Sequence, residues 1–187
     1  RVDVVGAGTM GGDIAAWCAL RGMQVTLEDR AAQYAAAAIK RAAVLFDRRV
    51  HDRWERQAVG DRLVVDLAGH GVARADVIIE AIVENVAAKR ELFAAIESRA
   101  RPDALLASNT SSIPLEQIAD ALDAPARLVG IHFFNPVAQM QLVEIIASPA
   151  TDAAAVAGAC AFVTAIDRLP LPVQSAPGFL VNRVLSP

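Results

Sequence analysis

Short apolar runs alternate along the chain with longer stretches in which apolar residues recur every third or fourth position. The runs have the length of strands, and the recurring spacing is that of helices that pack one face on a sheet. The predicted strands are 2–5, 23–29, 62–67, 75–83, 103–110, 127–134 and 141–148, with an extended segment at 169–173. The predicted helices are 13–21, 31–46, 47–60, 87–100, 113–122 and 151–166, and 178–187 has the pattern of a helix that is just starting.

The predicted strands are apolar throughout, without an alternating polar face. Such strands are typical of a parallel sheet whose connecting helices cover both sides. The pattern therefore predicts the α/β class, as a Rossmann-type, doubly wound, mostly parallel sheet with helices on both faces. We expect this domain to span 1–176, with the proline-rich piece 170–177 as its boundary. Residues 177–187 would then begin a C-terminal helical domain that this sequence truncates.

Composition narrows the possible classes of function. The chain has 187 residues, a formal charge of −3 and 55% hydrophobic residues, which is enough for one well-packed domain. No basic stripe stands out, which argues against nucleic-acid binding, and no apolar run approaches the ~20 residues of a membrane span. Cys18 and Cys160 form neither a metal-binding nor a disulfide pattern, so we expect two buried thiols and no metal.

A glycine-rich turn follows the first predicted strand. Gly6, Gly8 and Gly11, with Thr9 and Met10 between the last two, match the pattern G-x-G-x-x-G. The match is weak alone, but here it leaves an apolar strand and opens a helix, which is the setting of a pyrophosphate-binding loop. The glycines would allow close approach of the backbone, and the helix start would offer unpaired N–H groups. The alternative is an ordinary glycine turn.

An acidic residue ends the second predicted strand. Asp29 follows Glu28 and precedes Arg30. A carboxylate at this position can accept hydrogen bonds from an adenosine ribose and would repel a 2′-phosphate. The sequence therefore favours NAD over NADP, although the adjacent Arg30 leaves that preference open.

Two polar residues interrupt neighbouring apolar runs. His132 lies within the run 127–134, and Glu144 lies within the run 141–148. A lone histidine at a strand end is more often structural, but a buried carboxylate needs a partner, and His132 is the candidate. A histidine paired with a glutamate is a stronger base with a fixed tautomer. We therefore expect the two side chains to meet.

Further polar residues follow other apolar runs. The segment 108–112, SNTSS, ends a predicted strand, and in open α/β sheets that edge lines the ligand crevice. Asn182 follows the apolar run of 178–181 and should also need a partner. We expect Ser108 and Ser112 to be turn and capping residues.

The segments GAGTMG, IVEN, SNTSS, HFFNP, LVEII and GFLVNR occur together, and in this order they resemble the 3-hydroxyacyl-CoA dehydrogenases. The resemblance covers essentially the whole chain, as the NAD-binding domain of that family. The sequences of the segments 71–85 and 107–119 are most similar to those in the dehydrogenase part of multifunctional fatty-acid oxidation proteins. Those proteins carry a fused enoyl-CoA hydratase domain. Stand-alone 3-hydroxybutyryl-CoA enzymes are also similar.

The resemblance implies roles for particular residues. His132 matches the catalytic base and Glu144 its partner, Ser111 matches a serine that contacts both substrate and nicotinamide, and Asn182 matches an asparagine near the substrate oxygen. The implied cofactor contacts are Met10, Asp29, Ile82, Val83, Glu84, Lys89, Ser111 and Asn135, in addition to the glycine loop. Glu84 and Lys89 would flank one ribose, or else form a surface charge pair. The basic residues of 40–49 give no clear match to the family's CoA contacts, which stay unassigned.

The implied reaction is the NAD-dependent oxidation of (S)-3-hydroxyacyl-CoA to 3-oxoacyl-CoA in fatty-acid β-oxidation. The substrate hydroxyl would give its proton to His132 while C3 gives a hydride to the nicotinamide. Two alternatives remain open: a β-hydroxyacid dehydrogenase, and a non-catalytic dinucleotide-binding or structural protein on the same fold.

The expected partners and compartment also follow from the resemblance and the composition. We expect an acyl-CoA substrate and either a homodimer or fused or associated hydratase and thiolase components. Abundant arginine and alanine favour a bacterial, cytoplasmic protein. Residue 1 is Arg and not Met, so a preceding targeting segment, and with it a mitochondrial or peroxisomal location, stays open.

Overall fold

The computed structural model describes residues 1–185, without the side chains of Asn182 and Leu185. Its centre is an 8-stranded sheet with the strand order β3-β2-β1-β4-β5-β6-β7-β8. All pairings are parallel except that of β6 with β7. The strands are β1 (Val2–Val5), β2 (Val25–Glu28), β3 (Leu63–Val65), β4 (Val77–Glu80), β5 (Leu105–Ser108), β6 (Leu128–Phe133), β7 (Leu142–Ala147) and β8 (Leu169–Gln174). The predicted doubly wound, mostly parallel α/β fold is confirmed.

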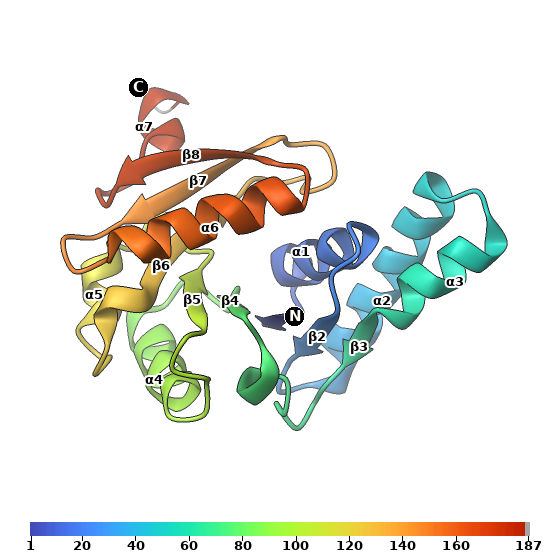
Figure 1. Cartoon of the computed structure of the whole chain (residues 1–187), viewed down its shortest axis with the longest axis horizontal. Coiled ribbons are helices and arrows are strands. Elements are labelled where there is room, and N and C mark those ends of the chain that lie inside the picture. The colour runs from blue at the N-terminus through green and yellow to red at the C-terminus, as the bar shows by residue number, and fades with distance from the viewer. Residues whose placement is uncertain (186–187) are drawn as a thin grey trace.

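Helices connect the strands and flank the sheet (Figure 1). In Figure 1, α2 and α3 lie beside β2 and β3 at the right end of the molecule, whereas β7, β8 and α7 lie at the upper left. The helices are α1 (Thr9–Leu20), α2 (Ala32–Arg49), α3 (Arg53–Asp61), α4 (Val86–Glu97), α5 (Leu115–Ala119), α6 (Ala153–Ala165) and α7 (Val181–Leu185), with short 3-10 turns at Val72–Arg74 and Pro125–Arg127. Within residues 1–185 no helix combines the length and the apolar character that crossing a bilayer requires.

Two hydrophobic clusters lie on the two faces of the sheet. Successive side chains of a strand point to opposite faces of the sheet. Val4 of β1 accordingly belongs to one cluster and its neighbour Val5 to the other. The first cluster buries the faces of α1, α2 and α6, and the second buries those of α4 and α5. Cys18 is buried in the first cluster, where desolvation raises its pKa to about 12, whereas Cys160 is only half-buried, contrary to prediction.

The proline-rich piece predicted as a boundary is largely part of the sheet. Residues Leu169–Gln174 form β8, which pairs with β7 along its whole length. Leu169 donates its backbone N–H to Gln141 O. The backbone N–H groups of the odd-numbered residues of β8 therefore point toward β7. Pro170 and Pro172 therefore direct their missing donors away from the sheet, and proline is tolerated in such an edge strand. A boundary within this piece would have to follow Gln174.

Candidate active site

The glycine turn connects the end of β1 to the start of α1. Gly6 has a positive φ of 109°, and a side chain there would also meet Ala81 O at 2.6 Å. A Cβ on Gly11 would lie only 1.8 Å from Gly6 O, so the turn closes tightly onto the helix. At Gly8 a Cβ would meet nothing within 4 Å. The chain's own packing therefore requires the first and third glycines, whereas the second faces open space.

This open space lies over the start of α1. Gly8 is the residue that precedes the helix, and no side chain caps the first N–H groups there. Such groups bind anionic oxygens, so the turn has both the donors and the clearance that a pyrophosphate needs. Arg41 of α2 braces the turn from behind, with Nη2 donating to Gly8 O at 2.9 Å and Nε to Asp13 at 3.0 Å. Arg41 is thus engaged within the domain itself.

Asp29 is held beside the glycine turn at the end of β2. Its Oδ2 accepts from Ala7 N at 2.8 Å, and its Oδ1 accepts from Ala31 N at 3.1 Å. The side chain is half-buried, so part of it is accessible beside the turn. The turn and the carboxylate together fit the pyrophosphate and ribose of a dinucleotide.

His132 and Glu144 face each other across the antiparallel pair β6–β7. They are register partners, and His132 Nδ1 lies 2.8 Å from Glu144 Oε2. Glu144 is fully buried, and His132 is 6% exposed between the rings of Phe134 and Phe179, at 4.5 and 5.8 Å. An ionised carboxylate accepts a hydrogen bond from Nδ1–H, and this leaves Nε2 as the ring nitrogen available to a group in the adjoining pocket.

An open pocket of about 480 Å³ joins this pair to the glycine turn. It lies where the carboxyl ends of β1, β4, β5 and β6 meet, which is where open α/β sheets bind their ligands. The residues that line it include some predicted to bind the cofactor and some predicted for catalysis. They are Gly8, Thr9, Met10, Ala81, Ile82, Val83, Glu84, Asn109, Ser111, His132, Phe133, Phe134 and Asn135. The structure thus brings most of the residues predicted for cofactor and catalysis to one opening.

Glu84 organises the serine turn at the edge of this pocket. Its Oε1 accepts from the hydroxyl of Thr110, from Ser111 N at 3.0 Å and from Ser112 N at 3.1 Å. Partial burial alone would raise the pKa of Glu84, but the Thr110 hydroxyl, the Lys89 ammonium and the two backbone N–H groups lower it to about 2. Glu84 is therefore ionised at neutral pH, and it fixes the backbone that carries Ser111.

Lys89 lies behind Glu84 and not at the surface. It is 1% exposed, and Nζ lies 2.5 Å from Glu80 Oε1 and 3.4 Å from Glu84 Oε2. The alternative of a surface charge pair is therefore wrong, because α4 carries Lys89 inward, toward the buried end of β4. Lys89 is not among the residues that line the pocket, but its ammonium lies beside Glu84, which lines it.

Two predicted site residues are placed less directly. Asn135 lines the pocket and precedes a cis peptide bond to Pro136. Asn182 lies in α7, but its side chain is outside the described part of the chain, so its predicted contact has no structural counterpart here. Within the described residues, no group of three or more potential ligands is arranged for a metal ion.

Two polar residues of the predicted segment 108–112 take part in the site, and a third polar residue, Glu80, was not predicted from the sequence. Glu80 is fully buried and accepts from Ser108 Oγ at 2.6 Å as well as from Lys89. Asn109 lines the pocket and accepts from Phe133 N at 2.9 Å, and Thr110 binds Glu84. Glu80 carries the same signal as Glu144, a carboxylate within an apolar run, and could have been found by it.

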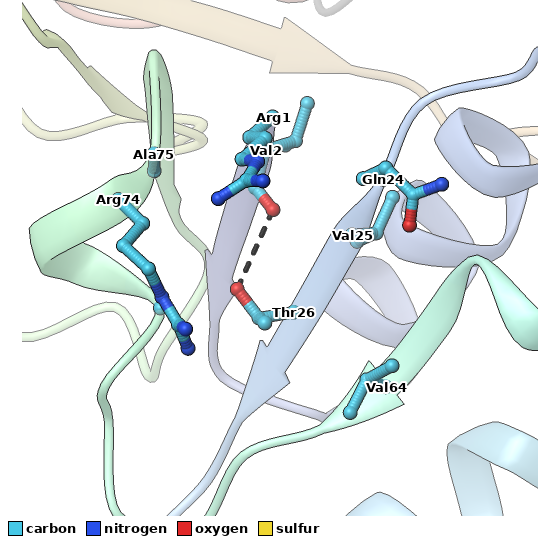
Figure 2. Close-up of a pocket in the computed structure, with 9 residues that line it drawn as sticks. Arg1, Val2, Gln24, Val25, Thr26, Val64, Arg74 and Ala75 are labelled. Carbon is cyan, nitrogen blue, oxygen red and sulfur yellow. Dashed lines mark hydrogen bonds between the residues drawn. The ribbon is translucent and has the colours of Figure 1, made fainter.

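A second pocket lies at the opposite edge of the sheet (Figure 2). It is lined by Arg1, Val2, Gln24 and Val25, at the amino ends of β1 and β2, and by residues of 64–75. Figure 2 shows the Thr26 hydroxyl beside Val2 O. The contact is long, at 3.5 Å, because the hydroxyl donates its one proton mainly to Asp3. This pocket is separated from the glycine turn by the length of the strands, so it is not part of the dinucleotide site.

The chain is similar in sequence and in fold to known proteins. The family model of the 3-hydroxyacyl-CoA dehydrogenase NAD binding domain matches residues 1–176. The crystal structure of FadB2 from M. tuberculosis has 37% identity and a TM-score of 0.94, over 99% of this chain and 67% of that one. The 3-hydroxybutyryl-CoA dehydrogenase of Escherichia coli K12 has 37% identity and a TM-score of 0.94, over 98% of this chain and 40% of that one.

A third similar structure comes from a larger enzyme. The dehydrogenase part of multifunctional enzyme 1 from C. elegans has 32% identity and a TM-score of 0.83, over 94% of this chain and 41% of that one. The chain thus spans between 40 and 67% of the length of these three structures. Its glycine turn, its sheet and its family match together identify NAD as the cofactor, and the chain belongs to the 3-hydroxyacyl-CoA dehydrogenase family, as its NAD-binding domain.

Proposed function

We propose that the protein oxidises the 3-hydroxyl group of an (S)-3-hydroxyacyl-CoA to a ketone, with NAD as the oxidant, in fatty-acid breakdown. The observation that carries the proposal is the 2.8 Å contact between His132 and Glu144. His132 lines the same pocket as Gly8 of the glycine turn. A buried His–Glu pair beside a dinucleotide loop is suited to removing a proton while a hydride leaves. The chemistry that NAD supplies when bound is acceptance of that hydride.

The chain's own residues account for the proton. Nε2 of His132 would take the proton of the substrate hydroxyl, because Nδ1 is held by Glu144. The buried carboxylate would then stabilise the imidazolium that forms, as a paired charge in a poorly solvated site. Ser111, on the turn that Glu84 fixes, would orient the hydroxyl toward Nε2. A positioned base of this kind contributes typically ~10²–10⁴-fold to the rate.

The C. elegans enzyme is described as the dehydrogenase part of a multifunctional enzyme, which supports a place for this domain in a larger fused protein. We propose an acyl-CoA as the substrate and either a homodimer or attached hydratase and thiolase components.

Turnover of defined substrates tests the proposal. The complete protein would be assayed for NADH formation with (S)-3-hydroxybutyryl-CoA, a long-chain 3-hydroxyacyl-CoA and free 3-hydroxybutyrate. We expect oxidation of one or both thioesters and little of the free acid. Oxidation of the free acid alone would support a β-hydroxyacid dehydrogenase. NAD binding without turnover of any of the three would support a non-catalytic dinucleotide-binding protein.

A further inference from the structure

The carboxylate of Glu144 has a second set of partners beyond His132. Its Oε1 accepts from Leu180 N at 3.0 Å and from Val181 N at 2.8 Å, while Oε2 faces the imidazole at 2.8 Å. These two amides lie 36 and 37 residues further along the chain, in the turn that leads into α7. One fully buried carboxylate therefore joins the proposed base to the segment that follows β8.

The turn before α7 has a shape that delivers these amides. Gly178 and Phe179 both have positive φ, at 73° and 47°, and Phe179 donates its N–H to Ala176 O at 2.9 Å. This conformation is unfavourable for a residue with a Cβ, so the surroundings must hold it. The Phe179 side chain is 2% exposed, and its ring lies 5.8 Å from that of His132. The turn is thus packed directly on the proposed base.

The start of the same segment is fastened to the other side of the site. Ser175 Oγ donates to Glu116 Oε2 at 2.7 Å and accepts from Leu115 N at 3.0 Å. Both partners belong to α5, the helix that follows the serine turn of 110–112. The segment 175–181 is therefore anchored at one end near the serine turn and at the other on Glu144.

We propose that the backbone amides of Leu180 and Val181 position the His132–Glu144 pair. With Oε1 held by two donors, the carboxylate cannot turn about its terminal bond, so Oε2 stays on Nδ1 of the imidazole. The proton then stays on Nδ1, and Nε2 stays free to accept one. Fixing a tautomer through the partner's geometry matters because the wrong tautomer cannot act as the base. The inference rests on the proposed function of His132.

Few other groups bear on this carboxylate. His132 faces it from β6, Leu171 is its register neighbour on β8, and Arg183 of α7 is exposed. Among the described residues no lysine or arginine pairs with Glu144. The two amides therefore supply donors that a buried carboxylate otherwise obtains from a cation.

Replacement of Val181 by proline tests the proposal, with Val181→Ala as the matched control. Proline lacks the N–H and is tolerated at the first residue of a helix, which Val181 occupies. We expect Val181→Pro to lower kcat about tenfold, as loss of a hydrogen bond to a charged group does. KM and the Kd for NAD should stay at the parent values. Nitrogen NMR of the cofactor-free protein should show part of the His132 ring in the Nε2–H tautomer, and Val181→Ala should match the parent.

A second variant covers the case in which the proline disturbs folding. Substitution of residue 181 by the α-hydroxy acid analogue of valine removes the same N–H, keeps the side chain and should give the same losses. Equal kcat and tautomer in the alanine, proline and ester proteins would overturn the inference. In that case loss of turnover in His132→Gln would still leave the proposed function standing, whereas full turnover in His132→Gln would remove the proposed function itself.

Discussion

Three acidic side chains are fully buried in the described part of the sheet, and each is compensated differently. Glu80 has the ammonium of Lys89 at 2.5 Å, and Glu144 has an imidazole and two backbone amides. Asp3 has only the hydroxyl of Thr26 as a donor, and its Oδ2 has no partner within the described residues. Burial of a carboxylate costs free energy unless it is paired, so these residues are the places where single substitutions should have distinct effects.

Glu144→Gln should abolish most turnover without unfolding the protein. The amide oxygen of glutamine can still accept from Leu180 and Val181, while its NH₂ group would face His132 Nδ1 and force the proton onto Nε2. With the wrong tautomer we expect a ~10²–10⁴-fold loss of kcat with an unchanged Kd for NAD. Steady-state kinetics and titration with NAD measure the two quantities, and parent-like kcat would count against the pair.

Asp3→Asn should stabilise the protein at neutral pH but not in acid. Burial is the main cause that raises the pKa of Asp3 from 3.8 to about 6, with Glu28 and Asp66 adding to it against the Thr26 hydroxyl. A raised folded pKa means that a penalty appears as the pH rises from 3.8 toward about 6 and persists above that. The asparagine should therefore add roughly 3 kcal/mol to the free energy of unfolding at neutral pH.

Urea unfolding at about pH 4 and about pH 8 measures this effect. Asp120→Asn is a suitable control because Asp120 is exposed and should respond little at either pH. An equal gain for Asp3→Asn at both pH values would show that the buried carboxylate does not titrate as stated. Thr26, whose hydroxyl donates to Asp3, lines the pocket drawn in Figure 2.

One pair of site residues could be predicted because each member interrupts an apolar run. His132 and Glu144 were predicted to meet on that signal, and the structure brings them together at 2.8 Å. Lys89 carries no such signal, because its burial depends on where α4 crosses the sheet and on Glu80 at the end of β4. The anchoring of Glu144 by residues near 180 is equally a property of the tertiary fold.

At the scale of elements, the ion pair of Lys89 and Glu80 connects α4 to β4. Ser108 of β5 donates a hydrogen bond to the same carboxylate, so β5 is connected as well. Lys89→Met should leave Glu80 buried without its cation, which typically costs ~3–5 kcal/mol. The double variant Glu80→Gln, Lys89→Met should lose less stability than the sum of the two single variants.

Denaturant unfolding of the four proteins gives this coupling directly. Arg101→Met, which breaks the exposed ion pair with Asp103, is the control and should change stability little. If Lys89→Met were no more destabilising than Arg101→Met, Lys89 would not compensate the buried carboxylate of Glu80. The same conclusion would follow if the stability losses of Glu80→Gln and Lys89→Met simply added in the double variant.

Element boundaries show what periodicity predicts and what it does not. The strands and helices predicted from apolar spacing are all present, with ends displaced by a few residues. The first helix of the predicted pair 31–46 and 47–60 continues to Arg49, and the second begins at Arg53. Asp52 caps that second start by accepting from Glu55 N at 2.8 Å, a local signal that the sequence contains. The edge strand β8 was harder to assign, because its prolines are acceptable only at an edge.

At the scale of the whole molecule, the strand order places all of the candidate chemistry at one edge of the sheet. The carboxyl ends of β1, β4, β5 and β6 surround one pocket, and β7 adds Glu144 from the antiparallel side. Alternating strands and helices imply crossovers between parallel strands, and such crossovers are right-handed in nearly all proteins. The order itself, and the reversal at β7, could not be deduced from the spacing of apolar residues.

Turnover and cofactor affinity of His132→Gln test the central claim most directly. Glutamine keeps a polar side chain of similar size at the pocket but cannot take up a proton as imidazole does. With (S)-3-hydroxybutyryl-CoA as substrate, we predict that NADH formation falls by at least ~10²-fold while the Kd for NAD stays at the parent value. Parent-like turnover, or a parallel loss of NAD binding and turnover, would contradict the division between a base at His132 and a cofactor site at the glycine turn.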